Sequence, residues 1–450
     1  MTPTLRAWPL LLVLTLAACS VRTQAPLAVA DASVAVVDVT VVDVVAGQLR
    51  PHSVVLVSGS RITRVTTATR FVAPPGAQVI DGRGRFLIPG LWDMHSHSLW
   101  SGPAMQSFLP LYVTQGVTGI RDMGGHLDLL AQYRASMREG DKPWPRVVAA
   151  GLVLDGPDPV QADISIAVTD ANSAIAAVDS LKLAGADFIK VYTLLEREPY
   201  FAAINEAKRV GLTVAGHLPA AITPEEAALA GQTSIEHLRD ELEPLCSPSK
   251  AEACAGLAKL FREQHTWQVP TLVVLRNKAG FDDPALATDP RLRYLPETLR
   301  KDWLAERSSK LGRGSDYLAR KRAWYADETW LAKTFVREKV PMLAGSDAGV
   351  AFSYPGFSLH DELGLLVEAG MTPLDALRAA TLLPAEFLGE RASMGAIDIG
   401  QAADMVLLRS NPLADIGATR EIEAVVLRGR VYDRAQLDGL LTKASAEADR

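Results

Sequence analysis

The sequence predicts an α/β fold, namely a (β/α)8 TIM-like barrel with a small β-sandwich domain built from both ends of the chain. Two observations support this prediction. Short apolar segments alternate with helical segments through residues 89–395, and valine-rich segments lie at residues 32–88 and 396–435. An open doubly wound sheet is the alternative, but no glycine-rich nucleotide-binding turn follows the first predicted barrel strand.

The N-terminal segment predicts export. Arg6 precedes the apolar run "WPLLLVLTLAA", which is too short to span a bilayer and is typical of a signal peptide. The run ends in "LAAC", which resembles the lipobox of bacterial lipoproteins, so we expect a signal peptide over residues 1–19 and a lipid on Cys19. Residues 20–31 then form a tether to a bacterial membrane, with the rest of the chain facing the periplasm. An ordinary secretory signal cut after the alanines is the alternative.

The composition excludes some classes of partner. The 450 residues are 48% hydrophobic, and 46 basic against 52 acidic side chains give a net charge of -6. Because no block of lysine and arginine is present, we expect no nucleic-acid partner. We expect a small-molecule substrate instead. A homo-oligomer is possible, and the composition does not decide the oligomeric state.

Both ends of the chain predict the β domain. The segment "VAVVDVTVVDVV" near the start and "IEAVVLRGRVYD" near the end are β-branched and free of helix signals. The two segments together predict one composite domain over residues 32–88 and 396–435.

The middle of the chain predicts the barrel. The eight candidate strands are "GLWDMHSH", "GVTGIRD", "RVVAAG", "DFIKVY", "LTVAGH", "TSIEH", "TWQVPTLVV" and "VPMLAGSD". Thr223, Pro224 and Glu226 predict a capping box at the start of one intervening helix. A charged insertion at about 277–339 predicts helices over the mouth of the barrel, and residues 436–450 predict a helical tail.

Two cysteines follow the sixth predicted strand. Cys246 and Cys254 flank "SPSKAEA" and would close a short disulfide loop in an oxidising compartment. Two free thiols are the alternative, and the spacing alone does not decide between them.

Polar residues gather where the predicted strands end. Barrel strands converge at their carboxyl ends, where active sites of this fold are built. Six metal-ligating or basic side chains come at these ends, namely His95, His97, Lys190, His217, His237 and Asp347. The other histidines, His52, His126, His265 and His360, do not occupy such positions.

The residue types favour a metal site. His95 and His97 alternate along a strand, so both imidazoles point to one face. Lys190 lies inside an apolar strand, where a charged amine is costly unless it is paired or modified. A reaction with carbon dioxide would make it an anionic carbamate ligand. Each residue also has a plain structural alternative, such as helix capping by His217 or Asp347 and a loop hydrogen bond from His237.

This constellation resembles the amidohydrolase superfamily in its binuclear-metal subtype. The matching motifs are "PGLWDMHSH", "FIKVY", "AGH", "IEH" and "GSDAG", in that order. "GVTGIRDMGG", "LHDELGLLVEAGMTPLDALRAATLLPAEFLG" and "IDIGQAADMVLLRSNPL" are similar to the imidazolonepropionase-like and Xaa-Pro-dipeptidase-like branch. The resemblance extends from about Val34 to Val431.

The resemblance implies a ligand set and a reaction. It implies that His95, His97 and Asp347 hold one divalent metal, that His217 and His237 hold a second, and that carboxylated Lys190 bridges them. Zinc is the expected metal. A hydroxide shared by the metals would then attack an amide bond of a small peptide-like or N-acyl amino acid substrate, with Asp347 transferring the proton.

Other interpretations stay open. One is a mononuclear cyclic-amide hydrolase or deaminase of the same superfamily, in which Lys190 is unmodified, and another is a non-catalytic binding lipoprotein. Tyr192, on the same strand face as Lys190, is a candidate substrate contact or a core aromatic side chain. Arg121 is a candidate anion ligand or the partner of Asp122 or another acid. The loop at residues 151–161 lacks the histidine that dipeptidase and carboxypeptidase relatives often carry there.

Overall fold

The computed structural model describes residues 32–448 except 68–70, 141, 239–241 and 243–245. The predicted signal peptide and tether, including Cys19, lie outside these residues. Within the described part of the chain, none of the helices combines the length and apolar character needed to cross a membrane.

The barrel consists of short parallel strands that are buried along most of their length. Its named strands are β6 (Leu91–Ser96), β7 (Val117–Asp122), β8 (Arg146–Ala149), β11 (Ile189–Val191), β12 (Val214–Gly216), β13 (Gln232–Glu236) and β14 (Trp267–Val269). Parallel pairing joins β6 to β7 to β8, and β11 to β12 to β13 to β14. The amide of Asp187, just before β11, donates to Ala149 O of β8 over 2.9 Å and connects the two groups.

The first six predicted strands are present. The seventh, "TWQVPTLVV", was predicted too long: it is a strand only over Trp267–Val269, and its last residues belong to a helix that begins at Leu272. The strand ends there because Pro270 has no backbone N–H to pair and Thr271 turns with φ 49°.

The eighth predicted strand closes the barrel as an extended segment with isolated bridges. Leu343 N donates to Gln268 O of β14, and Met94 N of β6 donates to Ala344 O, each over 2.9 Å. A Cβ atom on Gly345 would lie 2.8 Å from the Cβ of His95, which is too close for any larger residue. Gly345 therefore allows the last segment to lie directly against β6.

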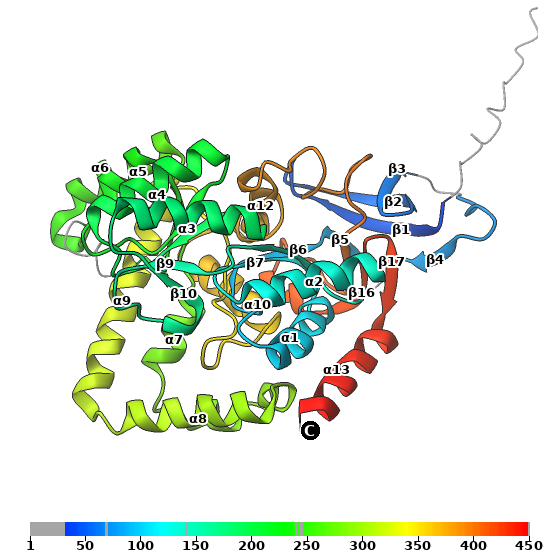
Figure 1. Ribbon diagram of the computed structural model, residues 1–450. Helices are drawn as coiled ribbons and strands as arrows, with labels where there is room; N and C mark the ends of the chain where they lie inside the picture. The colour runs from blue at the N-terminus through cyan, green and yellow to red at the C-terminus, as the bar shows by residue number, and fades with distance from the viewer. Residues whose placement is uncertain (1–31, 68–70, 141, 239–241, 243–245, 449–450) are drawn as a thin grey trace, which may run out of the picture.

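Helices surround the barrel, as the alternating pattern predicts (Figure 1). They are α1 (Gly102–Thr114), α2 (Leu127–Glu139), α3 (Ala171–Ala184), α4 (Arg197–Val210), α5 (Pro224–Ala230), α6 (Ala251–Gln264), α10 (Phe357–Glu368), α11 (Pro373–Ala379) and α12 (Leu382–Phe387). The capping box predicted at α5 is present, because Thr223 Oγ1 accepts from Glu226 N and the Glu226 carboxylate accepts from Thr223 N. Two further strands, β9 (Val153–Asp155) and β10 (Ser165–Ala167), extend the sheet of β11 to β14, with β9 paired to β11.

The insertion is helical, as predicted. It contains α7 (Leu272–Ala279), two 3-10 turns η3 (Pro284–Thr288) and η4 (Pro290–Tyr294), and the long helices α8 (Glu297–Leu311) and α9 (Ser315–Arg337). The C-terminal tail forms α13 (Arg434–Ala448), which packs against α1 and η4. In Figure 1 the yellow-green α8 lies along one side of the barrel, near the red α13.

The small domain combines strands from both chain ends. Its members are β1 (Val34–Asp43), β2 (Gln48–Ser58), β3 (Arg61–Thr67), β4 (Gln78–Asp81), β5 (Phe86–Pro89), β15 (Met405–Leu408), β16 (Ile422–Leu427) and β17 (Arg430–Asp433). They form one continuous eight-stranded sheet, in which β5 lies between β1 and β15. Alternating residues of β1 enter different apolar clusters, Val36 on one side and Ala35 on the other. The valine-rich pattern therefore reflects burial on both faces.

A charged cluster crosses the interior of the barrel beneath its mouth. Arg121 of β7 donates from Nη2 to Glu236 Oε1 of β13 over 2.8 Å, and from Nε to Met94 O of β6 over 2.7 Å. Ser234 accepts from Arg121 Nη1 and also contacts the Glu236 carboxylate. Both charged side chains are at most 1% exposed. Arg121 thus pairs with a distant acid rather than with its neighbour Asp122, and it is no anion site on the surface.

Replacing Arg121 by Met tests this interior pair. The change leaves the Glu236 carboxylate buried without its countercharge, so we expect the free energy of unfolding to fall by about 3–5 kcal/mol. Urea denaturation followed by far-UV circular dichroism measures the loss. The matched control is Arg409→Met, which breaks the exposed Arg409–Glu423 pair and is expected to change stability by less than about 1 kcal/mol. Equal losses in the two variants would contradict the assignment.

Candidate metal centre

The predicted site residues meet at one cavity at the mouth of the barrel. The cavity has a volume of about 360 Å³, and its lining includes His97, Lys190, Tyr192, His217, His237 and Asp347. His95 lies beneath them and is fully buried. The carboxyl ends of β6, β11, β12 and β13 and the closing segment therefore deliver these side chains to a single place, as expected for a barrel.

Three of these residues are arranged as ligands of one cation. His95 Nε2 lies 3.4 Å and His97 Nε2 lies 3.3 Å from Asp347 Oδ1. Ligands at about 2.05 Å from a tetrahedral zinc ion are about 3.3 Å from one another, which matches these separations. His95 Nε2 is also buried with no hydrogen-bond partner. An imidazole lone pair held in this way fits a metal ion, so the donor set is suitable for a divalent cation.

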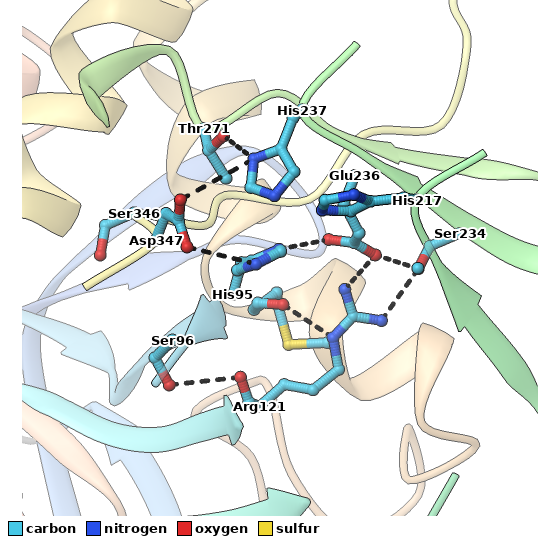
Figure 2. A network of polar contacts seen from close by, with 12 residues as sticks. His95, Ser96, Arg121, His217, Ser234, Glu236, His237, Thr271, Ser346 and Asp347 are labelled. Carbon is cyan, nitrogen blue, oxygen red and sulfur yellow. Dashed lines mark hydrogen bonds and ion pairs between the residues drawn. The ribbon is translucent and has the colours of Figure 1, made fainter. Parts of the chain in front are cut away.

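Each of the four histidines is oriented through its Nδ1 atom. His95 Nδ1 is 2.7 Å from Glu236 Oε2, and His237 Nδ1 is 2.7 Å from Thr271 Oγ1 (Figure 2). His217 Nδ1 is 2.9 Å from Thr193 Oγ1, and His97 Nδ1 is 3.3 Å from Gly124 O. Metal-ligating histidines commonly use one nitrogen for such a contact and the other for the metal. The pattern supports ligation through Nε2 in all four.

The remaining predicted ligands lie next to the first three. The rings of His217 and His237 are 4.9 Å apart, and those of His95 and His237 are 4.5 Å apart. Lys190 on β11 is 1% exposed and lines the same cavity. Tyr192 follows β11 and stacks on His217 with ring centroids 4.0 Å apart. Tyr192 is thus placed both to fix His217 and to contact a bound molecule.

Burial and local charge set the protonation of the buried groups. Burial lowers the pKa of His95 to about 4, which favours the neutral imidazole. Burial alone would raise the pKa of Glu236, but Arg121 and the hydrogen bond with His95 outweigh it and lower the pKa to about 2. Asp347 likewise has a pKa well below its usual range, because the neighbouring histidines outweigh its burial. The site therefore combines a neutral imidazole with two carboxylates, the protonation states needed for ligation.

Backbone strain concentrates at the same strand ends. His237 (φ 73°), Thr271 (φ 49°) and Asp347 (φ 54°) all adopt left-handed conformations that side-chain-bearing residues rarely use. Such strain persists where surrounding contacts enforce it, and it is common at functional sites. Here it turns the side chains at the ends of β13, β14 and the closing segment toward one another.

Sequence reasoning missed two groups of residues around the cavity. The first group orients the histidines and consists of Glu236, Thr193 and Thr271. In the sequence, these residues are recognisable only as polar side chains within or near the motifs that end the predicted strands. The second group comes from the insertion, where Leu299, Trp303 and Glu306 of α8 and Lys278 of α7 line the cavity. These contacts place the insertion over the mouth, as predicted, although no spacing in the sequence identified the residues that reach it.

Residues set aside in the sequence analysis have structural contacts. His360 of α10 bridges Thr419 Oγ1 and Gln115 O, at 2.9 and 3.0 Å from its two ring nitrogens. His52 pairs with exposed Asp38, and neither His126 nor His265 lines the cavity. Cys246 and Cys254, left open by the sequence, are joined in a disulfide with their Cα atoms 4.4 Å apart.

Known proteins share this architecture. A solved protein from Bifidobacterium longum that was assigned as a prolidase is 25% identical, with a TM-score of 0.71, over 91% of this chain and 98% of that chain. Bottromycin amidohydrolase is 25% identical, with a TM-score of 0.73, over 92% of this chain and 90% of that chain.

Sequence relatives agree with this likeness. Adenine deaminase 2 of Agrobacterium fabrum (strain C58) is 26% identical over 381 residues, and the match spans 82% of this chain but only 52% of that protein. Imidazolonepropionase of Idiomarina loihiensis is 35% identical over 71 residues, which are 16% of this chain and 17% of that protein. Residues 86–432 match the amidohydrolase family, and the chain therefore belongs to that family.

Proposed function

We propose that the protein is a metal-dependent hydrolase that cleaves a carbon–nitrogen amide bond in small peptide-like or N-acyl amino acid substrates. One observation carries the proposal. His95, His97 and Asp347 present donor atoms at the separation of tetrahedral ligands, in a cavity that Lys190, His217 and His237 also line. Amidohydrolase family membership and the prolidase-like and amidohydrolase neighbours support the same chemistry.

The chain offers ligands for two divalent cations, for which zinc suits the imidazole and carboxylate donors. His95, His97 and Asp347 would hold the first cation, and His217 and His237 would hold the second. Lys190 would complete this ligand set as a carbamate, formed when its neutral amine attacks carbon dioxide with formation of an N–C bond and release of one proton. The resulting carbamate is anionic, which explains a lysine on a fully buried strand.

When bound, such cations lower the pKa of a shared water and polarise a substrate carbonyl. Asp347 is the residue placed to handle protons, because its carboxylate reaches both His95 and His97 and lines the cavity. It takes the proton from the attacking water and delivers it to the leaving nitrogen. The pKa of Asp347 lies well below its usual range, which keeps the carboxylate ionised.

The shape and lining of the cavity favour short substrates. Its volume of about 360 Å³ lies at the small end for ligand pockets, and α8 closes one side of it. Lys278 and Glu306 add opposite charges to the lining, while Trp303 and Leu299 add apolar surface. A small molecule with polar ends fits this combination, and Tyr192 is placed to contact it.

We further propose that the enzyme is exported and anchored by a lipid on Cys19, facing the periplasm of a bacterium. The support is the apolar run that ends in "LAAC", followed by a short tether to the first described strand. A tethered periplasmic hydrolase would act on small nutrients or cell-wall fragments.

Metal content tests the binuclear assignment. After expression with added bicarbonate, elemental analysis is expected to approach two divalent metals per chain. Lys190→Met is expected to lower this to about one, because the bridging carbamate cannot form. A fully active wild-type protein with one tightly held ion would instead favour the mononuclear alternative.

A substrate panel tests the reaction. Dipeptides and N-acyl amino acids are expected to be hydrolysed by the dizinc enzyme. Asp347→Asn is expected to lower kcat by about 10²–10⁴-fold through loss of proton transfer, with Tm nearly unchanged. Asp398→Asn, an exposed change in the small domain, is the control and is expected to retain wild-type rates. Turnover of lactones, cyclic ureas or phosphotriesters with every linear amide inert would contradict the amide proposal.

Cell fractionation tests the anchor. A Cys19→Ala precursor is expected to lose lipidation and to leave the membrane fraction, whereas Thr23→Ala in the tether is expected to stay there. Detergent partitioning followed by immunoblotting measures both. Unchanged partitioning of Cys19→Ala would mean that the segment is an ordinary cleavage site.

A further inference from the structure

The residue that orients His237 has an unusual backbone. Thr271 lies just after β14 with φ 49° and ψ 43°, a left-handed conformation that is unfavourable for a β-branched residue. Its hydroxyl is 2.7 Å from His237 Nδ1, and both residues are buried. The strained turn thus places a hydroxyl where the imidazole needs a partner.

Thr271 also precedes α7, where a threonine normally caps the helix. A threonine at this position usually accepts a hydrogen bond from one of the first backbone amides of the helix. The Thr271 side chain makes no such bond. Its hydroxyl is directed to His237 instead, so the first turn of α7 needs another acceptor.

Glu362 of α10 supplies that acceptor. Its Oε1 atom accepts from Leu272 N over 3.0 Å, and its Oε2 atom accepts from Val273 N over 2.8 Å. A carboxylate at a helix N-terminus satisfies amides that have no partner within the helix and interacts favourably with the helix dipole. The carboxylate of a different helix therefore takes over the capping role of Thr271.

Glu362 has no other evident reason to be acidic. It is fully buried, and it is absent from the lining of the mouth cavity, so it does not touch a bound substrate. Burial raises its pKa to about 8, which shows how unfavourable an ionised group is there. The two amide contacts to α7 and the positive charge of Arg276 oppose this effect of burial.

We propose that Glu362 is a positioning residue for His237. By clamping the first turn of α7, it holds the strained backbone of Thr271 and leaves the Thr271 hydroxyl free to fix the imidazole. The consequence for metal binding rests on the proposed function, in which His237 is a ligand of the second cation. The clamp itself, from Glu362 through Thr271 to His237, does not depend on a bound metal.

The first measurement uses metal-free protein. Histidine side chains labelled with ¹⁵N are observed by NMR, and His237→Asn identifies the His237 signals. Thr271→Val removes the hydroxyl and defines the spectrum of a His237 ring without this partner. Glu362→Leu is expected to reproduce that change, and Glu362→Gln, which keeps one acceptor oxygen, is expected to give an intermediate change.

The second measurement is metal release from the loaded enzyme to a chelator. Loss of a contact that orients a ligand typically weakens metal binding by about 10–100-fold. In the Glu362→Leu and Thr271→Val variants, we expect one of the two metals to be released faster than from the wild-type enzyme by about that factor. The other metal is expected to be retained. A wild-type protein that holds fewer than two metals would overturn the binuclear assignment of the proposed function, while the histidine spectra would still decide the clamp.

His360→Gln is the matched control, because its ring nitrogens face Thr419 Oγ1 and Gln115 O, and the change therefore perturbs α10 at a place other than the Glu362 contact with the α7 amides. It is expected to lower Tm but to leave the His237 signals unchanged. A wild-type His237 spectrum in Glu362→Gln or Glu362→Leu would overturn the proposal. An equal shift in His360→Gln would also overturn it, because the effect would then be a general loosening of α10.

Discussion

The interaction on which the rest of the site depends is the buried contact of Glu236 with Arg121 and His95. One carboxylate oxygen accepts from the Arg121 guanidinium, and the other contacts His95 Nδ1. Two charges so deep in a barrel are tolerated only when their remaining polar atoms are also satisfied, and Met94 O and Ser234 complete the set. The same contacts join β6, β7 and β13, so the orientation of a candidate metal ligand and the assembly of three strands share one cause (Figure 2).

Strand β13 illustrates how closely fold and chemistry are linked. Its last residue, Glu236, points into the barrel and orients His95, while the next residue, His237, turns toward the mouth through a left-handed backbone. Adjacent positions thus serve two different ligands. A one-residue shift in the register of this strand would misplace both of them, since neighbouring side chains on a strand face opposite sides.

The sequence predicted the barrel, the two-ended β domain and the convergence of six polar side chains, because each follows from a local pattern. Short apolar segments ending in His, Lys or Asp identify strand ends without any knowledge of the neighbouring strands. The contacts to Nδ1 could not be predicted in this way. Thr193 and Thr271 lie 24 and 34 residues from their histidines, and only the tertiary arrangement reveals the pairing. The cavity contacts of Trp303 and Glu306 likewise depend on how α8 folds back over the mouth.

The place of β5 between β1 and β15 also has a consequence for how the chain acquires its structure. Leu87 pairs with Val41 on one side and with Leu407 on the other, and the second partner is 320 positions later in the chain. While the chain is being made, β5 therefore presents an open hydrogen-bonding edge until almost the whole sequence is available. Contacts of such long range slow folding, and open edges favour association with other chains. In the completed sheet the C-terminal strand β15 covers this edge of β5, just before the first barrel strand.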